Sequence, residues 1–191
     1  MSQGFTQPLP IPLPVNKGGT GVVTSTGTGA VVLGTTPTIN QPNLGGVTTV
    51  SNATAGSVGE YLSTIVLIGS AISLTTAVST NIATLSVTAG DWDIWGEIWY
   101  DGSAGTILIR AYQAITTVSA TISFTVPSND YSQSCFHGSV SAVGSVGAPI
   151  WPIPATRINV ASTTDVFMVV RADYTTPTLT AYGKICARRR R

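Results

Sequence analysis

Charged side chains are scarce in this sequence: they make up 9% of its 191 residues, against roughly 25% in an average protein. So few charges leave a surface of small polar and apolar residues, or one that neighbouring subunits cover. Four of the nine basic residues are the consecutive arginines 188–191, so the rest of the chain has five basic and eight acidic residues, a net charge of −3. An arginine run without interleaved aromatic residues is a weak sign of nucleic-acid binding. We expect no nucleic-acid partner, and an end that is exposed or forms ion pairs in an assembly.

Cysteine and histidine are also rare, and Cys135, Cys186 and His137 are the complete set. Two cysteines and one histidine cannot supply the four ligands of a structural zinc site within one chain, so we expect no metal and no cofactor. We expect both cysteines to be free, buried thiols; a disulfide across adjacent strands is the alternative. A lone histidine in a Ser-Gly stretch predicts an exposed side chain and not a member of a catalytic triad.

Long apolar runs are missing. No run reaches the ~18 residues of a membrane-spanning helix, and the N-terminus lacks the basic-then-apolar pattern of a signal peptide. We therefore expect no membrane insertion, and synthesis in a cytoplasm without signal-dependent export. Apolar residues at helical spacing are absent too, whereas the β-branched and small residues that favour strands are abundant. With 43% hydrophobic residues available for a core, the sequence predicts one all-β domain with an appendage.

Residues 1–16 differ in composition from the rest, with proline at every second position from Pro8 to Pro14. Proline fixes φ and has no N–H donor, which predicts an extended, polyproline-like arm. The apolar side chains of this arm would be wasted on a free linker. We therefore expect them to anchor the arm in another protein; they are Phe5, Leu9, Ile11 and Leu13.

Residues 17–56 are rich in glycine and threonine, with short valine clusters separated by turn signals. A single copy of this segment could not bury its few apolar residues. Disorder is one solution, and intertwining of identical chains is the other. The valines and the near absence of charge argue against disorder, so we expect an intertwined stalk.

Five short motifs resemble proteins of tailed bacteriophages. Three in the stalk resemble a tail-fibre repeat, in which a GGTG turn precedes a segment close to GAVVL, TSPTL and P-x-LG. Two in the following domain are similar to the heads of small phage and prophage fibres, which have a GDWDV strand and end in AYG-x-I-x-ARR. The motifs are KGGTG at 17–21, GTGAVVLGTTPTI at 27–39, QPNLG at 41–45, AGDWDI at 89–94 and LTAYGKICARR at 179–189. Only about one repeat precedes the head, so the resemblance implies a short fibre.

The resemblance implies a structural virion protein, assembled in the host cytoplasm and located on the virion tail. It also implies a homotrimer, because phage fibres of this kind are usually three-fold. The arm would bind other tail or baseplate proteins, and the head would attach to a glycan or protein of the bacterial surface. An architectural collar, capsid-decorating or baseplate protein without receptor contact is the alternative.

Residues 57–191 predict an antiparallel β-sandwich head, and a jelly roll best fits the strand spacing. The dipeptide Asp101-Gly102 predicts a hairpin between strands 91–100 and 106–113. Four prolines predict an irregular, exposed excursion over 126–156. The expected strands are 60–67, 71–74, 82–88, 91–100, 106–113, 120–125, 157–161, 166–174 and 178–187.

Three of the four tryptophans fall in residues 90–100, a stretch long enough for a full strand. Side chains on a strand alternate between its two faces. One face, with Trp92, Ile94, Gly96, Ile98 and Tyr100, is expected in the core, and the other carries Asp91, Asp93, Trp95, Glu97 and Trp99.

Two uses are open for the outward residues Trp95, Glu97 and Trp99. They could bind a sugar, because aromatic planes and carboxylates suit it, or they could lie between subunits, where tryptophan is enriched. We expect a subunit interface on this strand. The region 127–156 is an equal or better candidate for ligand contact because loops carry recognition more often than strands; its candidates are Tyr131, His137 and Trp151.

The carboxylates Asp91, Asp93 and Glu97 would share one face of this strand, which resembles the paired acids of a glycosidase. Acids near strand starts are more often solvated or structural, and the resemblance implies that Trp92 and Asp93 are fold elements. We expect no catalytic residues and no enzyme.

Overall fold

A computed structural model describes residues 51–124, 132–141, 150–175 and 177–190. The predicted arm, nearly all of the predicted stalk, and Tyr131 lie outside these residues. Within them, no helix is long and apolar enough to cross a membrane.

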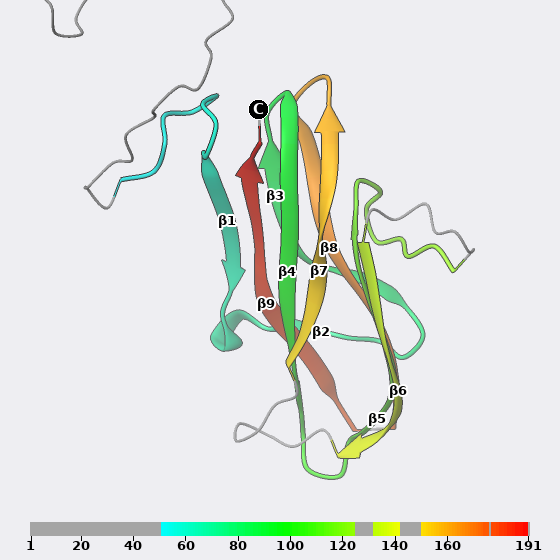
Figure 1. Cartoon of the computed structure of the whole chain (residues 1–191). Coiled ribbons are helices and arrows are strands. Elements are labelled where there is room, and N and C mark those ends of the chain that lie inside the picture. The colour runs from blue at the N-terminus through cyan, green and yellow to red at the C-terminus, as the bar shows by residue number, and fades with distance from the viewer. Residues whose placement is uncertain (1–50, 125–131, 142–149, 176, 191) are drawn as a thin grey trace, which may run out of the picture. The chain divides into compact units, whose positions relative to one another are not determined.

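The described chain folds into two antiparallel sheets, shown in Figure 1. One sheet, which we call sheet A, has the order β1-β9-β4-β7, with the short β2 also paired to β9; sheet B has the order β3-β8-β5-β6. The prediction of an all-β antiparallel sandwich is confirmed. The strands are β1 (Tyr61–Val66), β2 (Ile72–Ser73), β3 (Ser79–Val87), β4 (Gly90–Gly102), β5 (Ile107–Thr116), β6 (Ser132–Ser141), β7 (Ile150–Val160), β8 (Thr164–Tyr174) and β9 (Leu179–Arg189), and the 3-10 turn η2 (Ile68–Ser70) follows β1.

The strand pairing is that of a long antiparallel ribbon rolled up on itself. The first strand pairs with the last, β1 with β9, and the pairs β3 with β8, β4 with β7 and β5 with β6 follow inward along the chain. Further pairing of β4 with β9 and of β5 with β8 joins these pairs into the two four-stranded orders given above. This pairing is the jelly roll that the strand spacing predicts.

The core lies between the sheets, and β4 supplies its largest side chains. Trp92, Ile94, Ile98 and Tyr100 are fully buried, so the predicted inward face of this strand is confirmed. One polar contact crosses the core: Gln113 on β5 donates from Nε2 to the Tyr100 hydroxyl at 3.0 Å. Burial raises the pKa of Tyr100 far above its usual value, so this hydroxyl stays protonated.

The predicted hairpin between β4 and β5 is wrong, because the two strands belong to different sheets. Asp101 and Gly102 continue β4, where they pair with Thr180 and Leu179 of β9. The chain turns afterwards, with the Thr106 amide donating to the Ser103 carbonyl at 3.0 Å. A local turn signal marks where a strand ends, but it does not say which strand pairs with it.

Two further predictions about strands are wrong. Residues 120–124 form no strand; Ile122 instead packs with Ala114 and Val169 on the outer side of sheet B. The expected excursion over 126–156 contains all of β6 and the first part of β7. Pro152 and Pro154 lie within β7, which is tolerated because β7 is an edge strand.

Both cysteines are free, as expected. The expectation that both are buried holds only for Cys186, which accepts a hydrogen bond from the Tyr61 hydroxyl at 3.0 Å between oxygen and sulfur. Cys135 lies exposed on β6.

Candidate functional site

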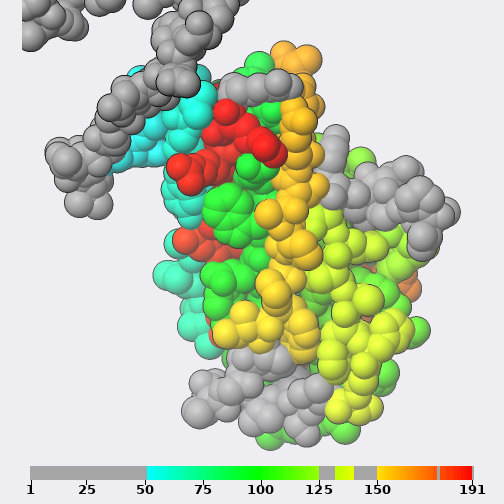
Figure 2. Space-filling model, viewed as in Figure 1, coloured from blue at the N-terminus to red at the C-terminus, as the bar shows by residue number. Residues whose placement is uncertain are grey.

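The outer face of sheet A brings together the residues of β4 that the sequence predicts to face outward. Figure 2, viewed as in Figure 1, shows atoms of β4 in green between β9 in red and β7 in gold. The strand register places the outward side chains of β4 opposite outward side chains of β9. These pairs are Trp95 with Cys186, Glu97 with Lys184, and Trp99 with Tyr182.

Aromatic contacts order this face. The rings of Trp99 and Tyr182 are stacked, with centroids 5.9 Å apart and planes 10° from parallel. The ring centroids of Tyr61 on β1 and Trp95 are 6.2 Å apart, and the Lys184 ammonium lies 5.9 Å from the Tyr61 ring centroid. Hydrogen bonding to Tyr61 is the largest cause that raises the pKa of Lys184, followed by neighbouring Cys186, Tyr61 and Glu97. Lys184 is therefore a cation at neutral pH.

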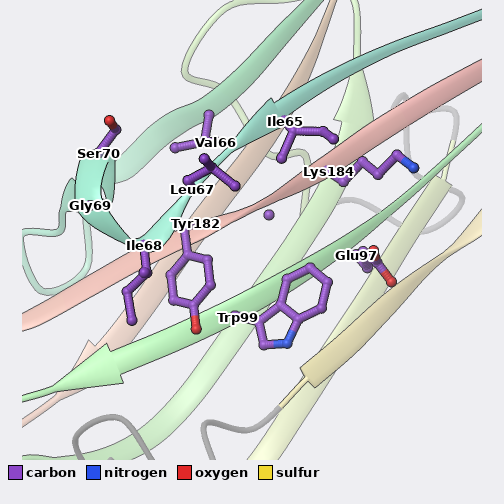
Figure 3. Close-up of a pocket in the computed structure, with 11 residues that line it drawn as sticks. Ile65, Val66, Leu67, Ile68, Gly69, Ser70, Glu97, Trp99, Tyr182 and Lys184 are labelled. Carbon is purple, nitrogen blue, oxygen red and sulfur yellow. The ribbon is translucent and has the colours of Figure 1, made fainter.

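A groove of about 670 Å³ opens on this face, where β1 and η2 meet β9 and β4. Figure 3 shows the stacked Trp99 and Tyr182 beside Ile68, and Glu97 and Lys184 also line the groove. One wall is apolar and formed by Ile65, Leu67 and Ile68, which are 52–68% exposed. We call this feature the β1–β4 groove. Its residues outside β4 were not predicted from the sequence.

The outer face of sheet B carries a second, smaller cluster of aromatic side chains. Tyr112 on β5 lies edge-on to both Phe124 and His137, with ring centroids at 5.0 Å and 5.7 Å. The Tyr112 hydroxyl and His137 Nε2 are 3.2 Å apart, and the Arg171 guanidinium lies 4.9 Å from the Phe124 ring centroid. We call this set the sheet B cluster. Among the described residues, Arg171 Nε is buried without a hydrogen-bond partner.

The six predicted ligand residues therefore do not form one site. Trp95, Glu97 and Trp99 lie on sheet A, whereas His137 lies exposed on sheet B, as expected for a lone histidine. Trp151 on β7 packs against Tyr100 at 5.2 Å and Phe136 at 5.0 Å between ring centroids, at the margin of the core. Tyr131 lies outside the described residues.

Two of the three outward carboxylates on β4 are held in ion pairs within the chain. Asp91 is buried and accepts two hydrogen bonds from Arg157, each 2.7 Å long. Asp93 pairs with Arg190 at 3.1 Å. These pairs join β4 to β7 and to the C-terminal end of the chain, so both acids act as fold elements. Within the described ranges, no three His, Cys, Asp or Glu side chains are placed to hold a metal ion.

Arg189 is the centre of a buried polar contact at the end of the core. Its Nε donates to Glu60 at 2.9 Å, and its Nη1 donates to the Ala89 carbonyl at 2.8 Å. The guanidinium also lies 4.3 Å from the Trp92 ring centroid, and the Trp92 ring nitrogen donates to the Thr88 carbonyl at 3.0 Å. We call Glu60, Trp92 and Arg189 the Arg189 staple. Of the four C-terminal arginines, Arg189 and Arg190 are thus engaged within the chain.

Comparison with known proteins gives little. No family model matches the chain, and no curated protein matches it. Among solved structures, it is similar to a structure of the Gx strain of infectious bursal disease virus, with 10% identity over 69% of this chain and 30% of that one and a TM-score of 0.36. A D431N mutant VP2 protein of the same virus in T=1 particles gives 11% identity, 80% and 36% coverage, and a TM-score of 0.34. The chain spans about a third of the length of these proteins.

Proposed function

We propose that this chain is a structural virion protein, a short bacteriophage tail fibre whose head attaches to the host surface. The observation that carries the proposal is the contact between the two head motifs that resemble fibre heads. Trp92 of the first motif and Arg189 of the second are register partners on adjacent strands and stack on one another. Trp92 and Arg189 are 97 positions apart in the sequence. Two distant motifs that complete one buried contact behave as a single signature, which supports the resemblance more strongly than either motif does separately.

The two outer faces of the sandwich suit two different roles. The face of sheet A, with its half-buried tryptophans and its groove, suits contact between copies, because aromatic residues are enriched and charges depleted at the centre of interfaces. We propose that it belongs to a homotrimer with the stalk 17–56 at its axis, and that the arm 1–16 fixes the fibre to the tail. No metal, cofactor, catalysis, nucleic acid or membrane insertion is part of this proposal.

We assign host contact to the sheet B cluster. Phe124 is 49% exposed and, together with Tyr112 and His137, offers flat apolar surfaces beside hydrogen-bonding groups, a combination that suits a surface glycan or a protein loop. The Arg171 guanidinium, 4.9 Å from the Phe124 ring centroid, adds a positive charge beside these rings. Three heads on one fibre would bind at the same time, and this avidity would raise the overall affinity above that of a single weak contact.

The test is staining of bacteria with the fluorescently labelled full chain, on a panel that includes a strain infected by the parent virus. We expect selective staining of susceptible strains. Phe124→Ala and His137→Ala should each reduce it at least about tenfold, as expected for central residues of a binding site. Ile150→Ala is the matched control, because Ile150 is similarly exposed, at 54%, but lies on β7 of sheet A.

Absence of staining on a strain that the parent virus infects would contradict host attachment. The architectural role, as a collar, decorating or baseplate protein, would then be preferred. Staining that survives both sheet B substitutions would keep the function and overturn only the assigned residues.

A further inference from the structure

The β1–β4 groove has a specific chemistry that limits what can occupy it. Ile65, Leu67 and Ile68 form an exposed apolar wall, and the stacked Trp99 and Tyr182 lie beside it. Three groups at the groove carry hydrogen-bond donors: the Trp99 ring nitrogen, the Tyr182 hydroxyl and the Lys184 ammonium. In the part of the chain that the structure describes, neither the Trp99 nitrogen nor the Tyr182 hydroxyl makes a hydrogen bond. Glu97 is the charged acceptor of the groove, and it lies opposite Lys184 in the strand register. The two uncharged donors therefore favour an occupant that is apolar and rich in acceptors.

A proline-rich peptide matches this chemistry. Each proline keeps its carbonyl acceptor but has no N–H donor, so such a segment has more acceptors than donors. Its extended conformation is preformed, so little entropy is lost on binding. Aromatic-lined grooves are the general sites at which proteins bind polyproline segments.

The chain itself contains such a segment. Residues 8–14, Pro-Leu-Pro-Ile-Pro-Leu-Pro, have no charge and no polar side chain. In a polyproline conformation seven residues extend about 22 Å, at roughly 3.1 Å per residue. Every side chain of the segment is apolar, so whichever edge faces Ile65 and Leu67 can bury apolar surface there.

We propose that the β1–β4 groove binds residues 8–14 of a second copy of this chain. The inference rests on the proposed function, in which the arm is an anchor, but it changes the partner: residues 8–14 join one copy of this chain to another and do not bind a tail protein. Between the arm and the first described residue lie the 36 residues 15–50, which can extend at most about 120 Å. This length lets an arm reach a neighbouring head in an assembly. The low charge of the chain agrees with a surface that other copies cover.

Binding can be measured with a labelled peptide of residues 5–16 and the full chain. To leave the groove free, the chain carries Leu9→Ser, Ile11→Ser and Leu13→Ser, which remove the apolar side chains of its own arm. We expect saturable binding by fluorescence anisotropy. Leu67→Asp should reduce the affinity for the peptide at least about tenfold, equivalent to ~1.4 kcal/mol of binding free energy, because it places a charge in the apolar wall. Ile109→Asp is the control on β5, since Ile109 is also exposed, at 42%.

A second measurement shows whether the arm joins different copies. The unmodified chain should associate in a concentration-dependent manner by analytical ultracentrifugation, and both the Leu67→Asp variant and the triple-serine variant should lose part of that association. Both residues changed in the groove test are exposed, so neither variant depends on repacking of the core.

Three results would overturn the inference: no saturable peptide binding, an equal loss of peptide binding with Ile109→Asp, or an unmodified chain that stays monomeric at all concentrations. Competition by simple sugars but not by the unlabelled peptide would assign the groove to a glycan instead. Cell staining through sheet B is measured separately, so failure of arm binding and failure of host attachment are distinguishable.

Discussion

Replacement of Arg189 by alanine is expected to lower the free energy of unfolding by about 3–5 kcal/mol, the usual cost of breaking a buried ion pair from one side. Arg189 and Glu60 are each only 5% exposed. The substitution leaves the Glu60 carboxylate buried without its cation, leaves the Ala89 carbonyl without its donor, and removes the guanidinium that covers Trp92. Urea unfolding of the full chain, followed by tryptophan fluorescence, measures the loss.

The matched control is Arg190→Ala, one residue further along. Its ion pair with Asp93 joins side chains that are 50% and 40% exposed, so the expected loss is about 0–1 kcal/mol. Equal losses for the two variants would show that the Arg189 staple does not hold the sandwich closed.

The effect of Arg189→Ala should also depend on pH. A hydrogen bond from the Gly56 amide is the largest cause that lowers the pKa of Glu60, with Arg189 adding to it. A carboxyl group whose pKa is lowered by folding stabilises the fold fully above its unfolded pKa, about 4.5, and loses this contribution as the pH falls through the lower folded value. The difference in the free energy of unfolding between the parent chain and Arg189→Ala should therefore become smaller at acid pH.

Replacement of Gly183 by alanine is expected to cost about 3 kcal/mol, at the upper end for an overpacked position. Gly183 lies in the middle of β9, opposite Ile98 of β4. A Cβ added there would overlap the backbone carbonyl oxygen of Glu97 and lie 3.2 Å from the Ile98 Cα. Since backbone atoms cannot rotate away as a side chain can, β9 must shift relative to β4.

Gly69→Ala is the control for this prediction. Gly69 lies in η2, and an added Cβ there would meet nothing within 4 Å; its substitution should change the stability by less than about 0.5 kcal/mol. Thermal unfolding of both variants separates a specific clash from a general intolerance of glycine replacement. A stable Gly183→Ala variant would mean that the strands are further apart than the structure has them. The clash also gives a physical reason for the glycine in the AYG motif.

The inward and outward faces of β4 could be predicted because strand alternation needs no knowledge of other strands. The alternation of Trp92, Ile94, Ile98 and Tyr100 identifies the buried face by itself. The β-sandwich class could be predicted too, since it depends on the number and spacing of strands, whereas the jelly-roll order within it is set by which strands pair.

Pairing between distant strands could not be predicted. Nothing local to β4 indicates that β9, some 80 residues later, supplies Tyr182 and Lys184 to its outer face. For the same reason the β1–β4 groove was missed, and the turn signal at Asp101-Gly102 was taken for a hairpin. The alternation of residues 179–189 does predict that Tyr182 and Lys184 share a face, which is the one signal that could have drawn attention to them.

The prolines of β7 led to the wrong prediction of an irregular excursion at this edge of sheet A. Pro152 and Pro154 exclude a central strand, but whether a strand is central or at an edge is decided by the complete sheet. β7 is an edge strand, so the prolines of this segment were compatible with the strand that the structure contains.

The central claim, that this chain is a tail fibre, is tested most directly by locating it on virus particles. Antibodies raised against the full chain, detected with gold particles by electron microscopy, would be applied to virions released from the host that produces it. The account predicts gold at the tail of intact particles. Virions without label, or label confined to the capsid, would contradict it.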